Sequence, residues 1–375
     1  MKIVISANST WNLINFRIGL IKALINKNYQ VVCLIPRGDS SDVLRDLGVR
    51  IREISIDPTG TNILAEIRYF INLSYILYKE SPNYYFGFTI KPNIYGALIS
   101  KFFGIKAILN ITGLGSSFLR RNLLTKITFF LYKIAFSSAT FVFFQNKDDQ
   151  QLFYKNKILL HNRTKILPGS GVDLKKFSRK YIPSVSYEFF NKNSPDSDFK
   201  FLLISRLLAD KGIYEFIESI KVLKRENRKF TALIIGAIDG LNSSGIDQSE
   251  LNHWISHGLI IHYNFIDDVR PFIFNADCVV LPSYREGTPK SLLEAGAMGK
   301  PLITTNVPGC KDVIDDGVNG FICKSRSSED LAKAMRKVLS MDKKILDTFG
   351  EESYKKISNE YDENIVHKMY LNVIN

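Results

Sequence analysis

Residues 278–304 read CVVLPSYREGTPKSLLEAGAMGKPLIT, and the order of their segments decides the fold. Residues 278–282 and 301–304 are short apolar runs with the length and composition of buried strands. The longer segment between them has a polar start and then residues that favour a helix. A strand, a helix and a second strand in this order connect parallel strands by a right-handed crossover. The stretch therefore predicts a parallel α/β sheet.

The same alternation repeats along the whole chain. Further strands are predicted at residues 2–7, 29–36, 50–56, 84–88, 107–111, 201–205, 231–236 and 260–263. We predict an α/β protein with two facing Rossmann-like, doubly wound domains and a cleft between them as the default ligand site. The predicted segments are a first domain at 1–180, a polar linker at 181–198, a second domain at 199–350, and a C-terminal helix at 351–375 that packs back toward the first domain.

Length and composition are consistent with this organisation. The chain has 375 residues, 45% of them hydrophobic and 23% charged, which fits two globular domains and excludes a disordered or repeat protein. Its four cysteines and five histidines have no metal-ligand spacing, so we expect no metal. The amino terminus has the pattern of a strand rather than a signal peptide, and no apolar run suits a membrane span. We expect a reduced, intracellular protein.

Positive charge is concentrated in the first half of the chain. The formal net charge is +13, and residues 1–180 hold 26 Lys and Arg against 10 Asp and Glu. Such asymmetry indicates a polyanionic partner, either nucleic acid or an anionic membrane surface. The basic residues are dispersed and match no nucleic-acid-binding motif. We therefore predict an anionic membrane surface as the partner of the basic N-terminal domain, and no nucleic acid.

Two segments of the first half combine apolar and basic residues. In residues 118–134, one apolar stripe at helical spacing is expected to face the core: Leu119, Leu123, Ile127, Phe130 and Ile134. Phe118 and Phe129 fall on the opposite side, flanked by lysines, and residues 63–78 are similarly rich in aromatic and aliphatic side chains. This pattern suits an interfacial membrane helix. The alternative is that the two phenylalanines pack under a loop while the lysines are simply solvated.

Two carboxylates in the deciding stretch are candidates for ligand binding. Glu286 and Glu294 are eight residues apart, which along a helix is about 12 Å. That is too far for the pair of a retaining glycosidase, at about 5 Å, but suits two ends of an elongated, hydroxyl-rich ligand. Thr288 is expected to cap a helix with Pro289 in its first turn, where free backbone N–H groups favour a phosphate.

Two cations follow the predicted strand at residues 201–205. Arg206 and Lys211 would lie at its carboxyl end, where open α/β sheets bind ligands, and both suit a diphosphate. Alternatively, they are a solvated pair beside a turn.

The motifs around Arg206 and Glu286 resemble those of a known family. Glu286-x7-Glu294 with Gly287, Pro289 and Ala295 is similar to the signature of retaining glycosyltransferase family 4, whose members have the GT-B fold. Further matching blocks are Ser205-Arg206 with Lys211-Gly212, residues 167–177 from Leu-Pro-Gly to Phe177, and residues 307–320 from Val-Pro-Gly to Gly320.

The resemblance implies roles for these residues. Arg206 and Lys211 would hold the donor diphosphate, and Glu286 would contact hydroxyls of the donor sugar; these three are the candidate catalytic residues. Glu294 would bind the ribose. The backbone of Gly287, Thr288 and Pro289 would approach the phosphate, and Gly171 would let main chain approach the nucleotide-sugar. The resemblance also implies retention of the anomeric configuration and no metal; no other cofactor is expected, and the nucleotide-sugar donor is a substrate.

The sequence departs from the family pattern in two places. Thr112 stands where many members have a histidine, and Thr cannot act as a general base near neutral pH. The first turn, residues 9–17, lacks the usual paired glycines. Both variations resemble bacterial polysaccharide-assembly members. They make Asn15, Arg17 and Thr112 candidates for the acceptor side, although Arg17 could equally be a surface residue at a helix start.

Together these features predict a retaining hexosyl- or N-acetylhexosaminyltransferase. It would move a sugar from a nucleotide-sugar, UDP-linked, to a lipid-linked saccharide acceptor in bacterial surface polysaccharide assembly of the O-antigen or capsule type. It would lie at the cytoplasmic face of the inner membrane as a peripheral protein. Two alternatives stay open: a UDP-sugar epimerase of the same architecture, and a non-catalytic nucleotide-sugar-binding scaffold.

Overall fold

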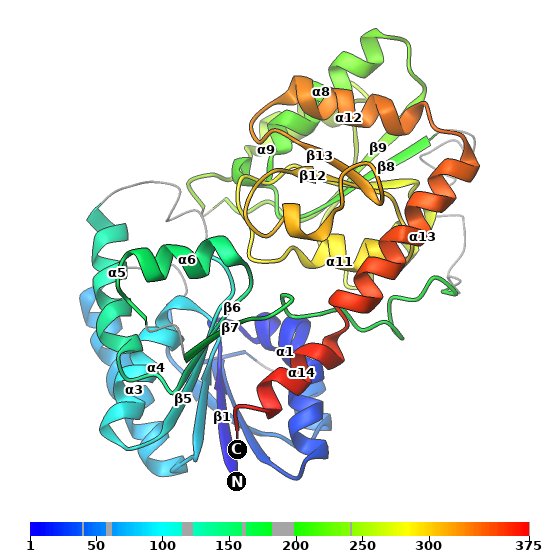
Figure 1. Ribbon diagram of the computed structural model, residues 1–375. Coiled ribbons are helices and arrows are strands. Elements are labelled where there is room, and N and C mark those ends of the chain that lie inside the picture. Colours follow the sequence, from blue (N-terminus) through cyan, green and yellow to red (C-terminus); the bar gives the residue numbers. More distant parts are fainter. Residues whose placement is uncertain are drawn as a thin grey trace. The chain divides into compact units, whose positions relative to one another are not determined.

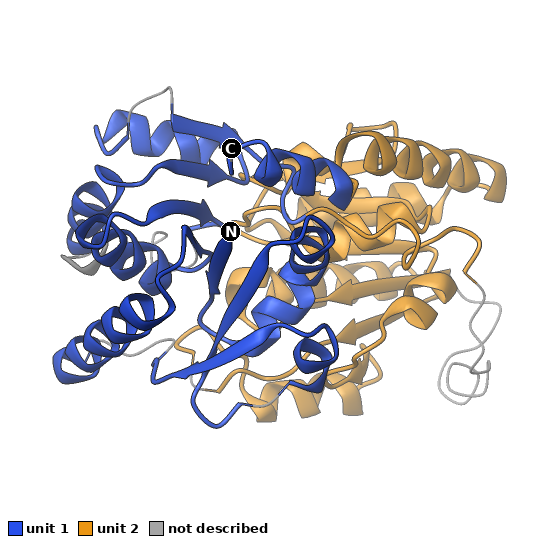
Figure 2. Cartoon of the chain, turned by 90° about the horizontal axis from the view of Figure 1, so that it is seen from below, with its two compact units in different colours: residues 1–170, 363–375 blue, residues 171–362 orange. Residues whose placement is uncertain are grey.

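The chain folds into two compact α/β units. The computed structural model describes residues 1–39, 41–57, 62–114, 123–159, 163–181, 199–240 and 242–374. Unit 1 comprises Met1–Ser170 and Glu363–Asn375, and unit 2 comprises Gly171–Asp362 (Figure 2). Each unit has its own parallel sheet with helices on both faces (Figure 1), which confirms the predicted fold class. The division falls after Ser170 rather than at residue 180, and the predicted linker lies outside the described residues except for Tyr181.

Unit 1 has a seven-stranded sheet in the order β3-β2-β1-β4-β5-β6-β7. All neighbouring strands are parallel; Ile5 of β1, for example, is opposite Cys33 on one side and Phe86 on the other. The strand order reverses between β1 and β4, and ligands of such sheets bind at the carboxyl ends there. The strands are β1 (Lys2–Ser6), β2 (Gln30–Pro36), β3 (Arg50–Ile54), β4 (Tyr84–Gly87), β5 (Lys106–Ile111), β6 (Phe141–Phe144) and β7 (Thr164–Ile166).

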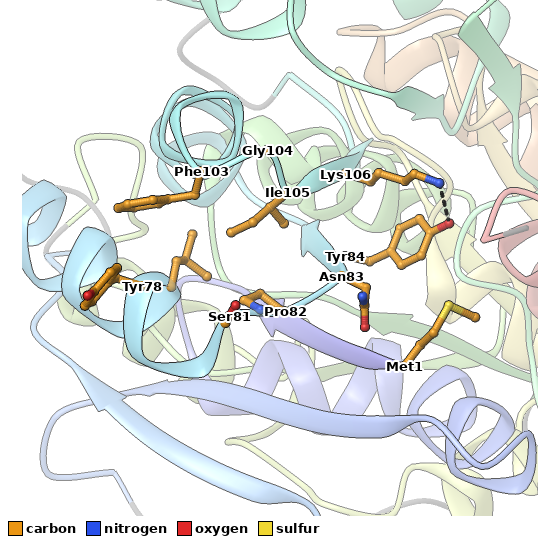
Figure 3. A pocket seen from close by; sticks show the side chains of 11 residues that line it. Met1, Tyr78, Ser81, Pro82, Asn83, Tyr84, Phe103, Gly104, Ile105 and Lys106 are labelled. Atoms are coloured by element: carbon orange, nitrogen blue, oxygen red, sulfur yellow. Dashed lines mark hydrogen bonds between the residues drawn. The ribbon is translucent and has the colours of Figure 1, made fainter.

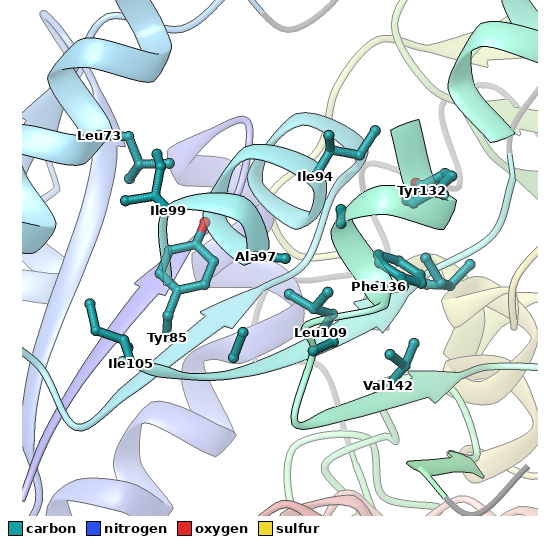
Figure 4. Packing of buried hydrophobic residues seen from close by; sticks show 14 of the residues in the cluster. Leu73, Tyr85, Ile94, Ala97, Ile99, Ile105, Leu109, Tyr132, Phe136 and Val142 are labelled. Carbon is teal, nitrogen blue, oxygen red and sulfur yellow. The ribbon is translucent and has the colours of Figure 1, made fainter. Parts of the chain in front are cut away.

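Helices cover both faces of this sheet because its strands are apolar on both sides. One face is covered by α3 (Ile63–Glu80), α4 (Ile90–Phe102), α5 (Leu123–Phe136) and α6 (Lys147–Lys155). Figure 4 shows Leu73 of α3, Ile94 of α4 and Tyr132 of α5 among the side chains packed over that face. The other face is covered by α1 (Thr10–Asn26), α2 (Asp42–Asp46) and the last helix, α14 (Glu363–Leu371).

The C-terminal segment completes the core of unit 1. The Tyr370 ring of α14 is fully buried and packs 4.7 Å from that of Phe143 and 5.6 Å from that of Phe86. Its hydroxyl accepts a 2.8 Å hydrogen bond from Asn110 Nδ2. The segment that joins unit 1 begins at Glu363, whereas residues 351–360 lie in α13 (Lys343–Glu360), which belongs to unit 2.

Unit 2 has a six-stranded parallel sheet in the order β10-β9-β8-β11-β12-β13. Its strands are β8 (Phe199–Ile204), β9 (Phe230–Ile235), β10 (Ile261–Tyr263), β11 (Cys278–Leu281), β12 (Leu302–Thr305) and β13 (Gly320–Cys323). One face packs against α8 (Ile213–Arg225), α9 (Gln248–Ser256) and α12 (Ser328–Leu339). The other packs against α10 (Arg270–Asn275), α11 (Lys290–Ala297) and α13.

The prediction for the apolar stripe of α5 is wrong in orientation. Ile127, Phe130 and Ile134 are 46%, 63% and 44% exposed, so they face away from the core. Phe129, expected on the exposed side, is half-buried, and its ring lies 5.8 Å from that of Phe153 on α6. The helix is apolar on both sides, and the side that carries Tyr132, Ala135 and Phe136 packs against the sheet and α6. Phe118 and Leu119 lie outside the described residues.

Candidate functional site

The carboxyl edge of the unit 2 sheet brings two of the predicted residues into contact. Strands β8 and β11 are neighbours, so the segments that leave them lie side by side. Lys211 is the last residue of a 3-10 turn, Ala209–Lys211, and its Nζ donates a hydrogen bond to Glu286 Oε1. Ser283 Oγ donates to the same oxygen at 2.7 Å. The side chains of Lys211 and Glu286 are 21% and 15% exposed, so the pair is sheltered but open to a ligand.

Glycines allow the loops around this pair to approach closely. Gly212 has φ +73°, and a Cβ there would lie 2.1 Å from the carbonyl oxygen of Pro282. Gly309 has φ +79°, and its Cβ would lie 2.0 Å from the carbonyl oxygen of Gly287. Side chains at these positions would push the β8, β11 and β12 loops apart. Both glycines belong to motif blocks identified in the sequence, and their packing explains why the blocks contain glycine.

Arg206 lies at the same sheet edge but in a separate ion pair. Its Nη1 is 2.8 Å from Asp239 Oδ2, in the segment that follows β9, and its side chain is 61% exposed. Because the guanidinium is largely solvated, this pairing holds it only weakly and leaves donors for a ligand.

Glu294 is the most buried of the four charged residues predicted for the donor site. It lies on α11, is 9% exposed, and its carboxylate is 3.6 Å from Lys290 Nζ. Burial raises the pKa of Glu294 above its ordinary value, although the positive charges of Lys290 and Lys176 oppose the rise. A buried carboxylate with this environment can accept hydrogen bonds from ligand hydroxyls while excluding water.

The start of α11 differs from the prediction. The N-cap is Pro289, without a side-chain cap hydrogen bond, and the helix begins at Lys290; Thr288 is therefore not the cap. Proline before a helix fixes the backbone without needing a side-chain acceptor. Glu286 lies in the preceding loop, so the separation derived from a helical path does not apply. Gly287 is buried beneath the Gly309 turn.

Gly171 occupies the first position of unit 2. It is buried with φ +71°, in the left-handed region that favours glycine. The next residue, Val172, donates its N–H to the carbonyl oxygen of Tyr361 at 2.9 Å, which fixes the chain at this point.

In unit 1, two of the three acceptor candidates meet at Phe88. The Arg17 guanidinium lies 4.2 Å from the centre of the Phe88 ring, and Thr112 Oγ1 donates a 3.3 Å hydrogen bond to the Phe88 carbonyl oxygen. Asn15 is half-buried on α1, and its Nδ2 donates to the carbonyl oxygen of Trp11 at 3.1 Å. Residues two apart on a helix point to different sides, so Asn15 and Arg17 do not share a face.

Arg17 is a buried cation rather than a surface residue at a helix start. It is 2% exposed, and burial lowers its pKa to about 10. Its Nε has no hydrogen-bond partner, and no carboxylate of the described residues pairs with it. An unneutralised guanidinium at the carboxyl edge of the sheet is suited to an anionic ligand group.

Several residues at these two edges were not identified from the sequence. In unit 2 they are Ser283 and Asp239; in unit 1 they are Phe88, Asn110 and Tyr370. Ser283 directly follows the strand predicted at residues 278–282, and this position is a signal that the sequence offers. Tyr370 is far away in the chain, and nothing in its local sequence indicates that it contacts Asn110.

A hollow of about 530 Å³ lies at the opposite, amino edge of the unit 1 sheet (Figure 3). Tyr78 and Phe103, at the ends of α3 and α4, line one side, and Tyr84 and Lys106, at the starts of β4 and β5, line another. None of the predicted donor or acceptor residues lines it.

The described residues contain no group of three or more His, Cys, Asp or Glu side chains that could hold a metal ion. Within the same parts of the chain, every helix is too short or too polar to cross a bilayer.

Comparison with known proteins identifies the family. Residues 2–146 match the model "Glycosyl transferase 4-like", and residues 186–356 match "Glycosyl transferases group 1". The chain is 29% identical to the N,N'-diacetylbacillosaminyl-diphospho-undecaprenol alpha-1,3-N-acetylgalactosaminyltransferase of Campylobacter jejuni, over 99% of this chain and 97% of that protein. It is 21% identical to the UDP-Gal:alpha-D-GlcNAc-diphosphoundecaprenol alpha-1,3-galactosyltransferase of Escherichia coli, over 82% and 78%.

Solved structures show the same fold. The Anabaena HepE protein, in complex with UDP and glucose, superposes with a TM-score of 0.82 at 17% identity, covering 100% of this chain and 99% of that one. This likeness confirms the GT-B fold. With the two family models matching in order along the chain, the protein belongs to the glycosyltransferases, with a 4-like first half and a group 1 second half, and it is a transferase rather than an epimerase.

Proposed function

We propose that the protein is a retaining, metal-independent glycosyltransferase that takes a sugar from a UDP-sugar and adds it to a lipid-linked saccharide. The observation that carries the proposal is the Lys211–Glu286–Ser283 cluster at the carboxyl edge of the unit 2 sheet. The Campylobacter and Escherichia relatives, whose names specify diphospho-undecaprenol-linked substrates, support the acceptor class.

The donor would bind to unit 2. Lys211 and Arg206 would hold the diphosphate, Glu286 would accept hydrogen bonds from sugar hydroxyls, and Glu294 from the ribose. In the reaction, the bond between the anomeric carbon and the diphosphate oxygen breaks, and the acceptor hydroxyl oxygen forms the new bond on the same face. The two cations stabilise the charge that develops on the departing diphosphate, which is commonly the largest catalytic contribution.

The acceptor would bind to unit 1. Arg17 is buried and lacks a carboxylate partner among the described residues, so it suits one charge of a lipid diphosphate. Thr112, at the position where many family members have a histidine, cannot take the proton of the acceptor hydroxyl. We assign that proton to the departing phosphate oxygen.

The setting of the reaction is a membrane surface. The excess positive charge of residues 1–180 would hold the basic unit against the anionic, cytoplasmic face of the bacterial inner membrane as a peripheral protein. This placement suits an enzyme of O-antigen- or capsule-type polysaccharide assembly, whose growing saccharide is anchored in that membrane.

Calorimetry with UDP, GDP and ADP tests the donor site. We expect selective binding of UDP, weakened by Arg206→Ala and unchanged by the matched variant Arg225→Ala at the far end of α8. A folded wild-type protein that binds none of the three nucleotides would favour a non-catalytic scaffold. Product analysis with a UDP-sugar but no acceptor provides a second check, because an epimerised nucleotide-sugar would contradict transfer.

A further inference from the structure

The helices on one face of unit 1 expose an unusual number of large apolar side chains. We define the α3–α5 face by six of them: Ile67, Ile71 and Tyr75 of α3, Phe102 of α4, and Phe130 and Ile134 of α5. Their exposed fractions run from 44% for Ile134 to 83% for Phe102. Large apolar groups exposed together on three neighbouring helices are typical of an interaction surface rather than of scattered surface residues.

The helices remain well packed beneath this face. In α3, Tyr69, Leu73 and Leu77 are buried against the sheet, while Ile67, Ile71 and Tyr75 recur at four-residue spacing on the side turned to solvent. Figure 4 shows α3, α4 and α5 side chains directed into the core on their inner sides. The exposed row is therefore an additional apolar side of helices whose core-facing side is already satisfied.

The net charge of the three helices that form the face is positive. The three helices carry Arg68, Lys79, Lys101, Lys126 and Lys133, all exposed. Their two carboxylates are Glu66 and Glu80, and both are held by cations: Glu66 by Lys91, and Glu80 by Lys2, Arg50 and Arg52. An apolar surface with a net positive border is complementary to an anionic partner.

The geometry points to one occupant. A symmetric dimer would place the same patch on both subunits, so its lysines would face lysines across the interface. An anionic bilayer has no such conflict, because its phosphates meet the lysines while its acyl boundary receives the apolar side chains. Aromatic side chains such as Tyr75 and Phe130 favour this boundary, and lysine stems can extend toward the phosphates.

We infer that the α3–α5 face is the membrane-docking surface of the protein, with Ile71 and Phe130 inserted at the boundary between the headgroups and the acyl chains of an anionic bilayer. This docking surface rests on the proposed function, because a transferase that uses a lipid-linked acceptor needs to lie at the bilayer. Apolar side chains inserted into the bilayer would then hold unit 1 there in addition to the attraction between its positive charge and the anionic lipids.

Vesicle flotation tests the surface. The probes are vesicles of phosphatidylglycerol with phosphatidylethanolamine, and vesicles of phosphatidylcholine alone. Ile71→Ser and Phe130→Ser should each reduce binding to the anionic vesicles roughly tenfold or more, because each removes one large apolar group from the contact. The matched variants Ile255→Ser on α9 and Phe265→Ser, which alter exposed apolar residues of unit 2, should bind as the wild type does.

Fluorescence quenching distinguishes insertion from other causes. Phe130→Trp should be quenched by lipids brominated on their acyl chains, and Ile255→Trp should not. Unquenched Phe130→Trp, together with wild-type binding by both serine variants, would overturn the inference. A concentration-dependent dimer in sedimentation that Phe130→Ser abolishes would assign the face to a second copy and equally overturn it.

A sugar-transfer assay without membranes tests the proposed function independently of the docking surface. With a short-chain, water-soluble lipid-diphosphate saccharide as acceptor, Ile71→Ser and Phe130→Ser should retain wild-type transfer, since neither residue is placed in the donor or acceptor site. Vesicle binding without any transfer by the wild type would contradict the function and leave the docking surface intact. If the wild type transfers sugar but neither Ile71→Ser nor Phe130→Ser changes vesicle binding, the proposed function stands and the docking surface is contradicted.

Discussion

Lys211 and Glu286 show how a single contact assembles a site from distant parts of the sequence. They are 75 positions apart, yet adjacent strands deliver them to one sheet edge, and Ser283 fixes the orientation of the carboxylate. The contact also prevents either charge from being buried alone, which would be costly. A cation and a carboxylate held side by side can serve a diphosphate and a sugar hydroxyl at the same time.

The two cations of the proposed donor site, Lys211 and Arg206, should affect turnover far more than a surface lysine does. Lys211→Ala and Arg206→Ala should each lower kcat by roughly 10²–10³, if each stabilises the departing diphosphate. Lys221→Ala, which removes a surface ion pair with Glu218 on α8, serves as the control and should be near wild type. Steady-state kinetics of sugar transfer measures all three, and near-normal turnover in both site variants would disprove their assigned role.

Replacing Glu294 by glutamine should weaken the binding of UDP and, at neutral pH, raise the thermal stability of the protein. Its pKa is raised by burial, so the folded state holds the proton more tightly than the unfolded chain does. The ionised carboxylate therefore destabilises the native state at pH values above its ordinary pKa, and this cost disappears as the pH falls through that range. Glu294→Gln should raise the melting temperature at neutral pH and have less effect under acidic conditions.

Glu294→Gln should also weaken UDP binding roughly tenfold or more, because the proposed hydrogen bond between the carboxylate and the ribose would be lost. Calorimetry and thermal unfolding at several pH values would measure the two effects. A variant that gains stability without losing UDP affinity would remove Glu294 from the donor site.

At the level of elements, local patterns identified most strands but could not orient the helices. Apolar runs located the strands at residues 2–7, 29–36 and 278–282 because buried parallel strands are apolar on both faces. The strands β6, β7 and β13 were not predicted, and β7 has only three residues with one exposed. The stripe of α5 was assigned to the wrong side because periodicity measures the angle between residues and not which side meets the sheet.

At the candidate site too, local sequence patterns predict some residues, whereas others depend on how the elements pack. Arg206, Lys211 and Glu286 are predicted from segments that follow predicted strands, and Glu294 from the helix that comes after Glu286; their ligand-binding roles stay predictions. Asp239 was not identified, since its role depends on which strand lies next to β8, and strand order is a property of the tertiary structure. The burial of Arg17 on α1 likewise involves Phe88, which follows strand β4 and is about 70 residues away in the chain.

The last helix should be essential for the stability of unit 1 in particular. Tyr370→Ala removes a fully buried ring in contact with β4 and β6 and should cost about 3–5 kcal/mol of unfolding free energy. Tyr78→Ala, at a position 65% exposed, is the matched control and should cost far less. Urea unfolding followed by hydrogen exchange should locate the loss in residues 1–170. An equal loss of protection in unit 2 would contradict this assignment.

For the whole molecule, the charge asymmetry and the α3–α5 face together determine how salt should act. Raising ionic strength shortens the screening distance from about 10 Å at 0.1 M to about 3 Å at 1 M. Binding to anionic vesicles should therefore weaken markedly, while a salt-resistant part persists because insertion of apolar groups is not screened. Flotation across a salt series measures both parts. Complete release would show that charge alone holds the protein, and unchanged binding would show that the basic residues contribute nothing.

The return of the chain into unit 1 has a consequence for synthesis on the ribosome. Residues 171–362 of unit 2 are contiguous, so that unit can fold as soon as its last helix has emerged. Unit 1 is made first but lacks α14, so the apolar sheet face that receives Tyr370 is covered only by α1 and α2 until residues 363–371 have been translated. The half of the protein that is translated first is therefore the half that finishes folding last, and during that interval it is the part that most needs protection from aggregation.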